Sequence, residues 1–399
     1  MRILFVCHEL PIPSYAGTLR VLNSLKYLAG KHGHKITLIG FRLPDKDYPD
    51  LSRYARIEAV DMAAWPGLQS PRAMFTALRN IFRERSIVKF AHSPEMARRI
   101  DVLLKGDSFD IMVVDHPTML VYASDRKIPV VLLEAFELSE IARMEYKHEK
   151  NWLKKAVRWI YYRQMRGRER AYRTATTSIA VSSYQADTVR SYCPGLDVEV
   201  ITFGVETDYF QAAEPETEFP SLVITGSLSV PANRRMVRHF YDRIYPLIKA
   251  RVPGIKLYIV GSDPGRDILK LAADTSVTVT GYVADLRPYL SRAWVVVAPL
   301  EEGFGVKVRI LQAMAMGKPV VATSLVARGI DVLPGENILL ADEPDEFAAK
   351  VVELLNDRKM RQTLGAAARR LMETEHAWEE LTERLSEVLE KAVKKMEAT

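Results

Sequence analysis

The chain has little cysteine and no long apolar run, and both shortages exclude whole classes of protein. Its 399 residues include only two cysteines, Cys7 and Cys193, which are too few for a disulfide framework or a zinc-binding set. No apolar run approaches the roughly 20 residues that a membrane-spanning helix needs. The run Ile3–Val6 is also too short for the core of a signal peptide. We therefore expect a cytoplasmic protein.

A strong imbalance of charge is missing as well. The net charge of +6 is modest, and the 27% of charged residues mix both signs, so the composition does not indicate binding to nucleic acid. Hydrophobic residues make up 48% of the chain, which excludes intrinsic disorder. Because single hydrophobic cores rarely grow beyond about 250–300 residues, we expect two domains.

Short runs of β-branched residues alternate with helical patterns along the whole chain. Runs of this kind, without polar alternation, are typical of strands buried on both faces of a parallel sheet. The sequence therefore predicts an α/β fold made of two Rossmann-like domains, with parallel sheets facing a cleft. We expect the strands at 3–6, 36–40, 111–115, 130–133, 178–181, 222–226, 257–261, 277–281, 294–298, 320–323 and 338–341.

The apolar pattern stops over 203–220 and then restarts, which indicates a linker between the domains. We place the first domain at 1–205 and the second at 206–376. A charged amphipathic helix follows at 377–399.

Ligands of open α/β sheets bind outside the carboxyl ends of the strands, so the loops after the strands are the candidate sites. A loop with Gly17 and Arg20 follows the first strand, and Gly226-Ser227 follows another, with Arg234 and Arg235 close behind. Backbone N–H groups at such helix starts suit a phosphate, with a plain turn as the alternative, and the two arginines taken alone are interpreted as solvated. Tyr282 and Val283 follow a third strand, where a nucleobase pocket and a core tyrosine both remain open.

The loop at 299–319 carries the most specific pattern. Glu301 and Glu302 follow a strand, and Gly303-Phe304-Gly305 then opens a helix that ends at Gly317. Glycines let a backbone approach a ligand closely, and carboxylates are strong acceptors for sugar hydroxyl groups. Basic residues at a helix start suit a diphosphate, which makes Lys307 and Arg309 candidates, with Gln312 on the same helix face as Arg309.

At this loop the chain resembles the retaining GT-B glycosyltransferases of family 4, the glycosyl transferases group 1. The resemblance extends over nearly the whole chain. It rests on Glu302–Gly305 and Leu311–Thr323, with support from Phe203–Phe210, Ile259–Gly261 and Val279–Val283.

The resemblance implies that the first domain binds the acceptor and the second a nucleotide-sugar, and that the last helix crosses back to the first domain. It implies a UDP- or GDP-sugar co-substrate with no other cofactor and no metal. Asp45-Lys46-Asp47, which spells a metal-binding DxD, is interpreted as a solvated turn. The implied donor-binding residues are Gly17, Gly226, Ser227, Tyr282, Val283, Gly303, Phe304, Gly305 and Gln312.

The catalytic candidates are Glu302, Lys307, Arg309 and His116. Gln312 stands where the family usually has a glutamate that binds the ribose, and its spacing from Glu302 is wider than that of the family's acidic pair. His116 ends a strand and is the candidate for the family's central histidine. Arg20, Glu134 and Glu137 are the candidates on the acceptor side.

The positive charge is concentrated in one segment. Residues 151–175 hold eight Lys or Arg and one Glu, and Trp152, Ala156, Trp159 and Ile160 share a predicted helical face. A basic amphipathic helix with aromatic residues is typical of a membrane-surface anchor. The alternative is a surface helix whose apolar stripe packs on the domain core.

We therefore expect a glycosyltransferase of cell-envelope polysaccharide biosynthesis that transfers sugar to a glycan, lipid-linked or small-molecule acceptor, in the cytoplasm or peripherally at the inner membrane face. Two alternatives stay open: a nucleotide-sugar epimerase of the same fold, and a binding or scaffold protein on a weakened fold. An NAD-dependent enzyme is disfavoured because no GxGxxG follows a strand.

Overall fold

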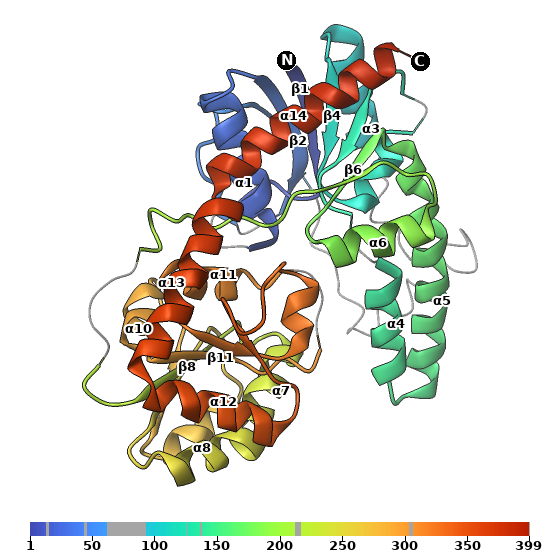
Figure 1. Cartoon of the computed structure of the whole chain (residues 1–399). Helices are drawn as coiled ribbons and strands as arrows, with labels where there is room; N and C mark the ends of the chain where they lie inside the picture. Colours follow the sequence, from blue (N-terminus) through green and yellow to red (C-terminus); the bar gives the residue numbers. More distant parts are fainter. Residues whose placement is uncertain are drawn as a thin grey trace. The chain divides into compact units, whose positions relative to one another are not determined.

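The computed structural model describes residues 1–12, 16–43, 46–61, 93–124, 126–135, 138–211, 217–302 and 306–398. These residues form two compact units, Met1–Ile201 with Thr382–Thr399, and Thr202–Leu381. Each unit is built on a parallel sheet with helices around it (Figure 1). The division lies a few residues from the boundaries expected from the sequence.

Within the described residues, the first unit contains a seven-stranded sheet in the order β3-β2-β1-β4-β5-β6-β7. All neighbouring strands are parallel, with Leu4 of β1 opposite Thr37 of β2 and Met112 of β4. The strands are β1 (Arg2–Cys7), β2 (Lys35–Arg42), β3 (Arg56–Asp61), β4 (Ile111–Val114), β5 (Val130–Leu132), β6 (Thr177–Ala180) and β7 (Val198–Val200).

The helices of the first unit alternate with its strands along the chain, as connections between parallel strands require. They are α1 (Ala16–Gly30), α3 (Pro94–Gly106), α4 (Leu138–His148), α5 (Trp152–Arg168) and α6 (Ser183–Tyr192), with 3-10 helices at Pro117–Tyr122 and Glu169–Thr174. Sequence signals mark the helix starts: Ser93 caps α3 and Ser182 caps α6 through their side-chain oxygens, which satisfies N–H groups that the first turn leaves unpaired.

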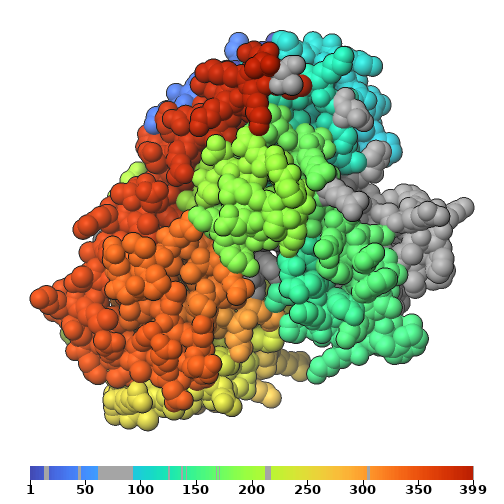
Figure 2. Space-filling view, turned by 45° about the vertical axis from the view of Figure 1, so that its right-hand side comes forward, coloured from blue at the N-terminus to red at the C-terminus, as the bar shows by residue number. Residues whose placement is uncertain are grey.

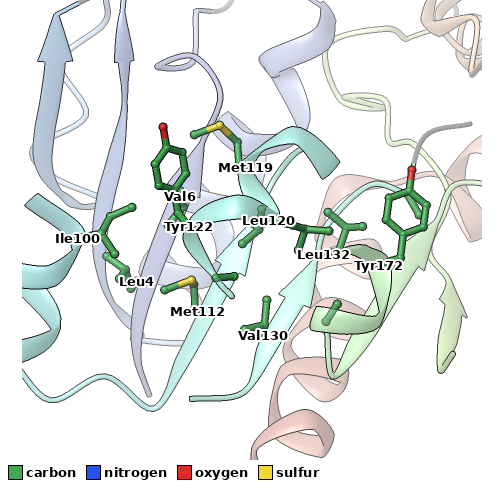
Figure 3. Packing of buried hydrophobic residues seen from close by; sticks show 14 of the residues in the cluster. Leu4, Val6, Ile100, Met112, Met119, Leu120, Tyr122, Val130, Leu132 and Tyr172 are labelled. Atoms are coloured by element: carbon green, nitrogen blue, oxygen red, sulfur yellow. The ribbon is translucent and has the colours of Figure 1, made fainter. Parts of the chain in front are cut away.

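One core lies between the first sheet and the helices on one of its faces. Leu4, Met112, Leu132 and Ile100 of α3 are fully buried there, and Figure 3 shows Met119, Leu120 and Tyr122 packing over the central strands. Ile3 and Phe5, which alternate with Leu4 on β1, are also fully buried, and burial on both faces explains the continuous apolar runs of the central strands.

The second unit, as far as the structure describes it, has a six-stranded parallel sheet in the order β10-β9-β8-β11-β12-β13. Its strands are β8 (Ser221–Thr225), β9 (Lys256–Val260), β10 (Val277–Gly281), β11 (Val295–Ala298), β12 (Val320–Ala322) and β13 (Leu339–Leu340). Its helices are α7 (Pro231–His239), α8 (Tyr245–Arg251), α9 (Arg266–Leu269), α10 (Arg287–Arg292), α11 (Val308–Ala315), α12 (Pro344–Asn356) and α13 (Arg358–Glu375).

The last helix, α14 (Trp378–Glu397), begins in the second unit and packs along the first unit for most of its length (Figure 1). Its predicted apolar face is buried, from Trp378 to Leu389. Polar contacts hold it to the first unit: Arg384 donates to the Val200 carbonyl at 3.0 Å, and Lys31 pairs with Glu383 at 3.3 Å. The crossing that the resemblance implied is therefore present.

Residues 203–205, near the start of the second unit, contact the residues at the start of α14. The ring of Trp378 lies against Gly204, where a Cβ would come within 2.3 Å of it. Val205 N–H donates to the His376 carbonyl at 2.8 Å, and His376 Nδ1 lies 2.8 Å from the Phe203 carbonyl. The glycine of this motif is thus required by packing rather than by a turn.

Two strands were not predicted. β3 and β7 are the edge strands of the first sheet, and their sequences, Arg56–Asp61 and Val198–Val200, mix charged with apolar residues. An edge strand is less buried than a central one and can therefore carry charged residues. These two strands lack the continuous apolar run from which the other strands were predicted. No helix in the described residues is long and apolar enough to cross a membrane.

Candidate functional site

The predicted donor loops of the second unit follow strands β8, β10 and β11, at the carboxyl edge of its sheet. β8 and β11 are neighbours in that sheet, with β9 and β10 on the other side of β8. Parallel strands place all these loops at one edge, where α/β folds bind ligands.

The loop after β8 is closely packed against the loop after β9. A Cβ on Gly261 would meet the Gly226 carbonyl oxygen at 1.7 Å, so the two backbones touch and position 261 requires glycine. Ser227 Oγ lies 3.0 Å from Ser262 Oγ, and the Asn233 side chain donates to the Ser227 carbonyl at 2.8 Å. These contacts fix the Gly226-Ser227 turn ahead of α7.

Tyr282 stands beyond the end of β10 with 76% of its surface exposed. This exposure excludes the core position that the sequence left open. Gly281 before it has a φ of 71°, a left-handed conformation that glycine adopts readily. Val283 beside it is partly buried.

The two carboxylates after β11 both have basic partners on α7. Glu302 pairs with Arg235 through the guanidinium Nε and Nη2 atoms. His239 Nδ1 lies 3.4 Å from a carboxylate oxygen of Glu301. Arg235 therefore pairs with a carboxylate while its side chain stays exposed to solvent, as the solvated arginine considered from the sequence implies. Gly303, Phe304 and Gly305 lie outside the described residues.

Lys307 and Arg309 stand at the start of α11, with Lys307 as the N-cap residue. Burial lowers the pKa of both side chains, because a low-dielectric environment disfavours a cation. The first turn of α11 has no acidic residue. Two cations and the positive end of a helix dipole thus share one helix start, an arrangement complementary to an anion. Gln312 is partly buried one turn further along.

Lys318, in the motif after α11, has a structural role. It is 7% exposed, and its ammonium donates to the carbonyls of Ser291 and Ala293 at 2.7 and 3.2 Å. These carbonyls end α10, where a cation offsets the negative end of the helix dipole.

In the first unit, the carboxyl edge of the sheet brings together His8 after β1, Asp115 and His116 after β4, and Glu134 after β5. These strands are adjacent in the sheet. The His8 backbone N–H donates to Asp115 Oδ1 at 2.9 Å, and the rings of His8 and His116 lie 5.5 Å apart between centroids. Sequence reasoning missed His8 and Asp115 as site residues, although Asp115 ends the predicted strand 111–115 and His8 lies two residues after the predicted strand 3–6.

His116 is held in one tautomer by its own turn. Its Nδ1 atom accepts the Thr118 backbone N–H at 3.3 Å and lies 2.7 Å from Thr118 Oγ1. An accepting Nδ1 carries no proton, so in the neutral ring the proton is on Nε2. Burial, with help from His8, lowers the pKa of His116 to about 3. The imidazole is therefore neutral at physiological pH and can donate from Nε2.

Asp115 has an unusual protonation state for a carboxylic acid. Burial raises its pKa to about 8; the His8 N–H opposes this shift and the charge of Glu134 adds to it. The carboxyl group therefore carries its proton over much of the neutral range.

Arg20 on α1 is 4% exposed and lies inside the first unit rather than on its surface. Its Nη2 donates to the Ile201 carbonyl at 2.7 Å, whereas Nη1 is buried without a hydrogen bond in the described part of the chain. Burial lowers the pKa of Arg20, and the charge of Glu134 opposes this. Arg20 and Glu134 thus interact electrostatically.

Gly17 lies in the first turn of α1, whereas Glu137 lies outside the described residues. Asp45 of the DxD-like sequence is also outside them. Over the described ranges, no group of three or more His, Cys, Asp or Glu could hold a metal ion.

Comparison with known proteins identifies the second unit. Residues 219–357 match the family model "Glycosyl transferases group 1". The match covers about a third of the chain and shows that this part is similar to the family. The chain has the GT-B fold, which it shares with solved structures that it resembles over nearly its full length at low identity.

One such structure is sucrose-phosphate synthase from Thermosynechococcus elongatus, with a TM-score of 0.69, 16% identity and coverage of 98% of this chain and 99% of that one. Another is Anabaena Alr3699/HepE in complex with UDP, with a TM-score of 0.66, 15% identity and coverage of 98% and 100%.

Among curated relatives, the chain is 31% identical over 233 residues to a "GDP-mannose-dependent alpha-(1-6)-phosphatidylinositol monomannoside mannosyltransferase" from Mycobacterium tuberculosis. It is 28% identical over 156 residues to the "Capsular polysaccharide biosynthesis glycosyltransferase CapM" from Staphylococcus aureus. The mycobacterial match covers 52% of this chain and 60% of that protein. The staphylococcal match covers 36% of this chain and 40% of that protein. The similarity thus spans less than two thirds of either relative.

Proposed function

We propose that this protein is a retaining glycosyltransferase that moves a sugar from a nucleoside diphosphate sugar to an acceptor hydroxyl group. The observation that carries the proposal is the pair Lys307 and Arg309 at the start of α11, two cations whose pKa values burial lowers. They stand in a domain that matches the glycosyl transferases group 1. A diphosphate leaving group develops negative charge, and preorganised cations stabilise such charge strongly.

The donor occupies the carboxyl edge of the second unit in this proposal. Lys307 and Arg309 bind the diphosphate, Gln312 binds the ribose, and Tyr282 with Val283 lines the base pocket. The exposure of Tyr282 leaves its ring available to stack on a base. Glu302 and the backbone of Gly303, Phe304 and Gly305 contact the sugar, and Gly226 and Ser227 lie near the diphosphate.

The nucleotide is proposed to be UDP or GDP. A mycobacterial relative is named as GDP-mannose-dependent, and a structural neighbour is in complex with UDP. These names favour the two bases about equally.

The acceptor is proposed to bind the first unit near His116, Glu134 and Glu137. His116 is a neutral donor through Nε2, which suits a hydrogen bond to a sugar hydroxyl group rather than proton abstraction. Glu134 accepts from an acceptor hydroxyl group, and the buried Arg20 acts through Glu134 as a positioning residue. The lipid named for the mycobacterial relative and the polysaccharide named for CapM favour a lipid-linked or glycan acceptor.

The reaction needs no protein nucleophile in this proposal. The bond between the anomeric carbon and the diphosphate oxygen breaks, and the acceptor oxygen bonds to the same face of that carbon, so the configuration is retained. The acceptor proton passes to the departing diphosphate oxygen. The transition state resembles an oxocarbenium ion, as in glycoside hydrolysis, and Lys307 with Arg309 offsets the charge on the diphosphate without a metal.

A thermal-shift screen tests the donor site. Purified protein is melted with UDP, GDP, ADP and their sugar conjugates, with and without EDTA. A ligand at 100 times its dissociation constant stabilises by about 2.7 kcal/mol, so a shift with one nucleotide that EDTA leaves unchanged supports the proposal. The absence of a thermal shift with every nucleotide would contradict the proposed donor site and favour a scaffold role.

Product analysis then separates transfer from epimerisation. An epimerase converts the nucleotide-sugar with no acceptor, whereas a transferase needs an acceptor or water. Conversion of the donor into an isomeric sugar, with its diphosphate still attached, would contradict sugar transfer.

We also propose that the protein acts peripherally at the inner face of the cell membrane, through residues 151–175. The basic, aromatic composition of this segment and the lipid acceptor named for the mycobacterial relative support this location.

A further inference from the structure

Helices α4 and α5 form a hairpin on the first unit. Three residues separate the end of α4 from the start of α5, and the two helices lie side by side (Figure 1). Asn151 caps α5 by accepting the N–H groups of Leu153 and Lys154. Arg158 joins the helices, with its Nε 3.3 Å from Glu149 and its Nη1 donating to the Glu145 carbonyl at 3.0 Å. The hairpin is therefore held as one element.

The aromatic stripe of α5 faces outward. Trp152 is 75% exposed and Trp159 is 48% exposed. Ala156, Arg163 and Arg166 are also exposed, and their spacing places them on the same helix face as the two tryptophans. Ile160, which the sequence placed on that face, is partly buried, and Met165 is fully buried. The alternative in which the tryptophans pack on the domain core is therefore wrong.

The hairpin, Leu138–Arg168, carries the excess positive charge of the protein. It contains nine Lys or Arg and three Glu, a net of +6 that equals the net charge of the whole chain. All three glutamates pair inside the hairpin, Glu140 with Arg143, and Glu145 and Glu149 with Arg158. The excess charge thus belongs to the lysines and arginines of the outer face and of the turn. Figure 2 shows the hairpin, in teal and green, as part of the molecular surface.

We propose that the outer face of α5 binds an anionic lipid surface, with Trp152 and Trp159 at the level of the headgroups. Tryptophan is enriched at membrane–water interfaces, and each basic residue near an anionic surface adds about 1 kcal/mol of attraction. Leu153, 53% exposed in the first turn, adds apolar area at the tip. This inference deepens the proposed membrane location and does not depend on sugar transfer.

The composition of the face favours lipid over a protein partner. Protein–protein interfaces are depleted in lysine at their centres, whereas Lys147, Lys150, Lys154 and Lys155 all lie in or beside the turn that carries Trp152. Arg163 also lies over the Trp159 ring, 5.7 Å from its centroid. An indole beside a guanidinium is suited to the boundary between acyl chains and anionic headgroups.

Co-sedimentation of the full chain with vesicles tests the proposal. Vesicles of phosphatidylcholine mixed with phosphatidylglycerol are compared with vesicles of phosphatidylcholine alone, at low and high salt. We expect binding to the mixed vesicles at low salt, and weaker binding at high salt because exposed charges are screened. Two double variants, Trp152→Ala/Trp159→Ala and Lys154→Glu/Arg163→Glu, should each bind at least about tenfold more weakly.

The matched control is Leu269→Ala/Lys270→Glu, an exposed apolar and basic pair on the second unit, which should bind as the wild type does. Failure of the wild type to bind the mixed vesicles would overturn the inference, as would equal binding by all variants. A wild-type dimer that the tryptophan substitutions dissociate, without vesicle binding, would show that the face binds a second copy instead. Thermal shifts with nucleotides should be the same for the wild type and all variants. If no protein shows a shift, the proposed donor site is contradicted, and the membrane inference is unaffected.

Discussion

Arg235 on α7 and Glu302 after β11 form an ion pair across the loops that end neighbouring strands β8 and β11. The Arg235 side chain is 58% exposed, whereas Glu302 is 19% exposed. The carboxylate therefore already satisfies this guanidinium, and a diphosphate has to compete with Glu302 for it. Lys307 and Arg309 are the better candidates for binding phosphate, because both stand at the positive end of α11 in a partly buried position, where attraction to an anion is stronger than in water.

The first prediction compares these basic residues directly. Lys307→Ala and Arg309→Ala should each lower kcat about 100-fold, because each removes charge stabilisation that grows in the transition state. Arg235→Ala should change kcat by less than about threefold, since it removes an exposed ion pair. Steady-state kinetics with the donor found by thermal shift makes the comparison. A larger loss from Arg235→Ala than from Lys307→Ala would assign the diphosphate to α7.

The second prediction concerns the amide at position 312. Gln312→Glu replaces a neutral acceptor for a ribose diol with a charged one, and hydrogen bonds to charged groups contribute about 1 kcal/mol more than neutral ones. We expect about fivefold tighter binding of the nucleoside diphosphate, measured by isothermal titration calorimetry. Gln312→Ala should weaken binding. If Gln312→Glu weakens binding of the nucleoside diphosphate as much as Gln312→Ala does, Gln312 does not contact the ribose.

The third prediction follows from the raised pKa of Asp115, about 8 in the folded protein, against about 3.9 in an unfolded chain. Between these values the folded state keeps a proton that the unfolded state has lost. Asp115 therefore makes the free energy of unfolding fall as pH rises, by at most about 1.4 kcal/mol per pH unit. The contribution is constant above the folded pKa.

Asp115→Asn removes this titration and keeps an acceptor for the His8 N–H. The stability of the Asn variant relative to wild type should therefore increase from about pH 5 to about pH 8 and then level off. Urea unfolding across this range measures it. His8, His116, Glu134, Glu9 and Cys7 surround the site and are present in both proteins. A difference between variant and wild type that does not change with pH would show that Asp115 is ionised in the folded state.

The fourth prediction concerns Gly204, on which the Trp378 ring lies. Gly204→Ala places a Cβ within 2.3 Å of that ring, and overpacking of this kind costs about 1–3 kcal/mol. The variant should therefore melt at a lower temperature. Gly106→Ala is the control, because nothing lies within 4 Å of a Cβ at that position. Equal melting temperatures for the two variants would mean that Trp378 moves away without cost.

The central strands could be predicted from the sequence because burial on both faces leaves an unbroken apolar run, as in Ile3–Val6 and Val320–Ala322. The last helix was also predicted, since its apolar face from Trp378 to Leu389 is buried as the periodicity indicates. The edge strand β3 was not, because its residues Arg56–Asp61 need only partial burial.

The candidate site was less predictable, because its contacts join residues far apart in the chain. The pairing of Arg235 with Glu302, and that of His8 with Asp115, depend on which strands are neighbours, and sequence periodicity does not give strand order. The helical periodicity of α5 correctly put Trp152 and Trp159 on one face. It did not show whether that face points to the core or to solvent, and the structure shows both tryptophans exposed.

Retaining transfer from a nucleoside diphosphate sugar is the central claim, and hydrolysis of the donor tests it without knowledge of the acceptor. The protein is incubated with the nucleotide-sugar that gives the thermal shift, and proton NMR follows the sugar as water replaces the acceptor. We predict slow release of the nucleoside diphosphate, with the first-formed free sugar in the same anomeric configuration as the donor. A first-formed sugar of inverted configuration, or no release from a donor that binds, would contradict the account.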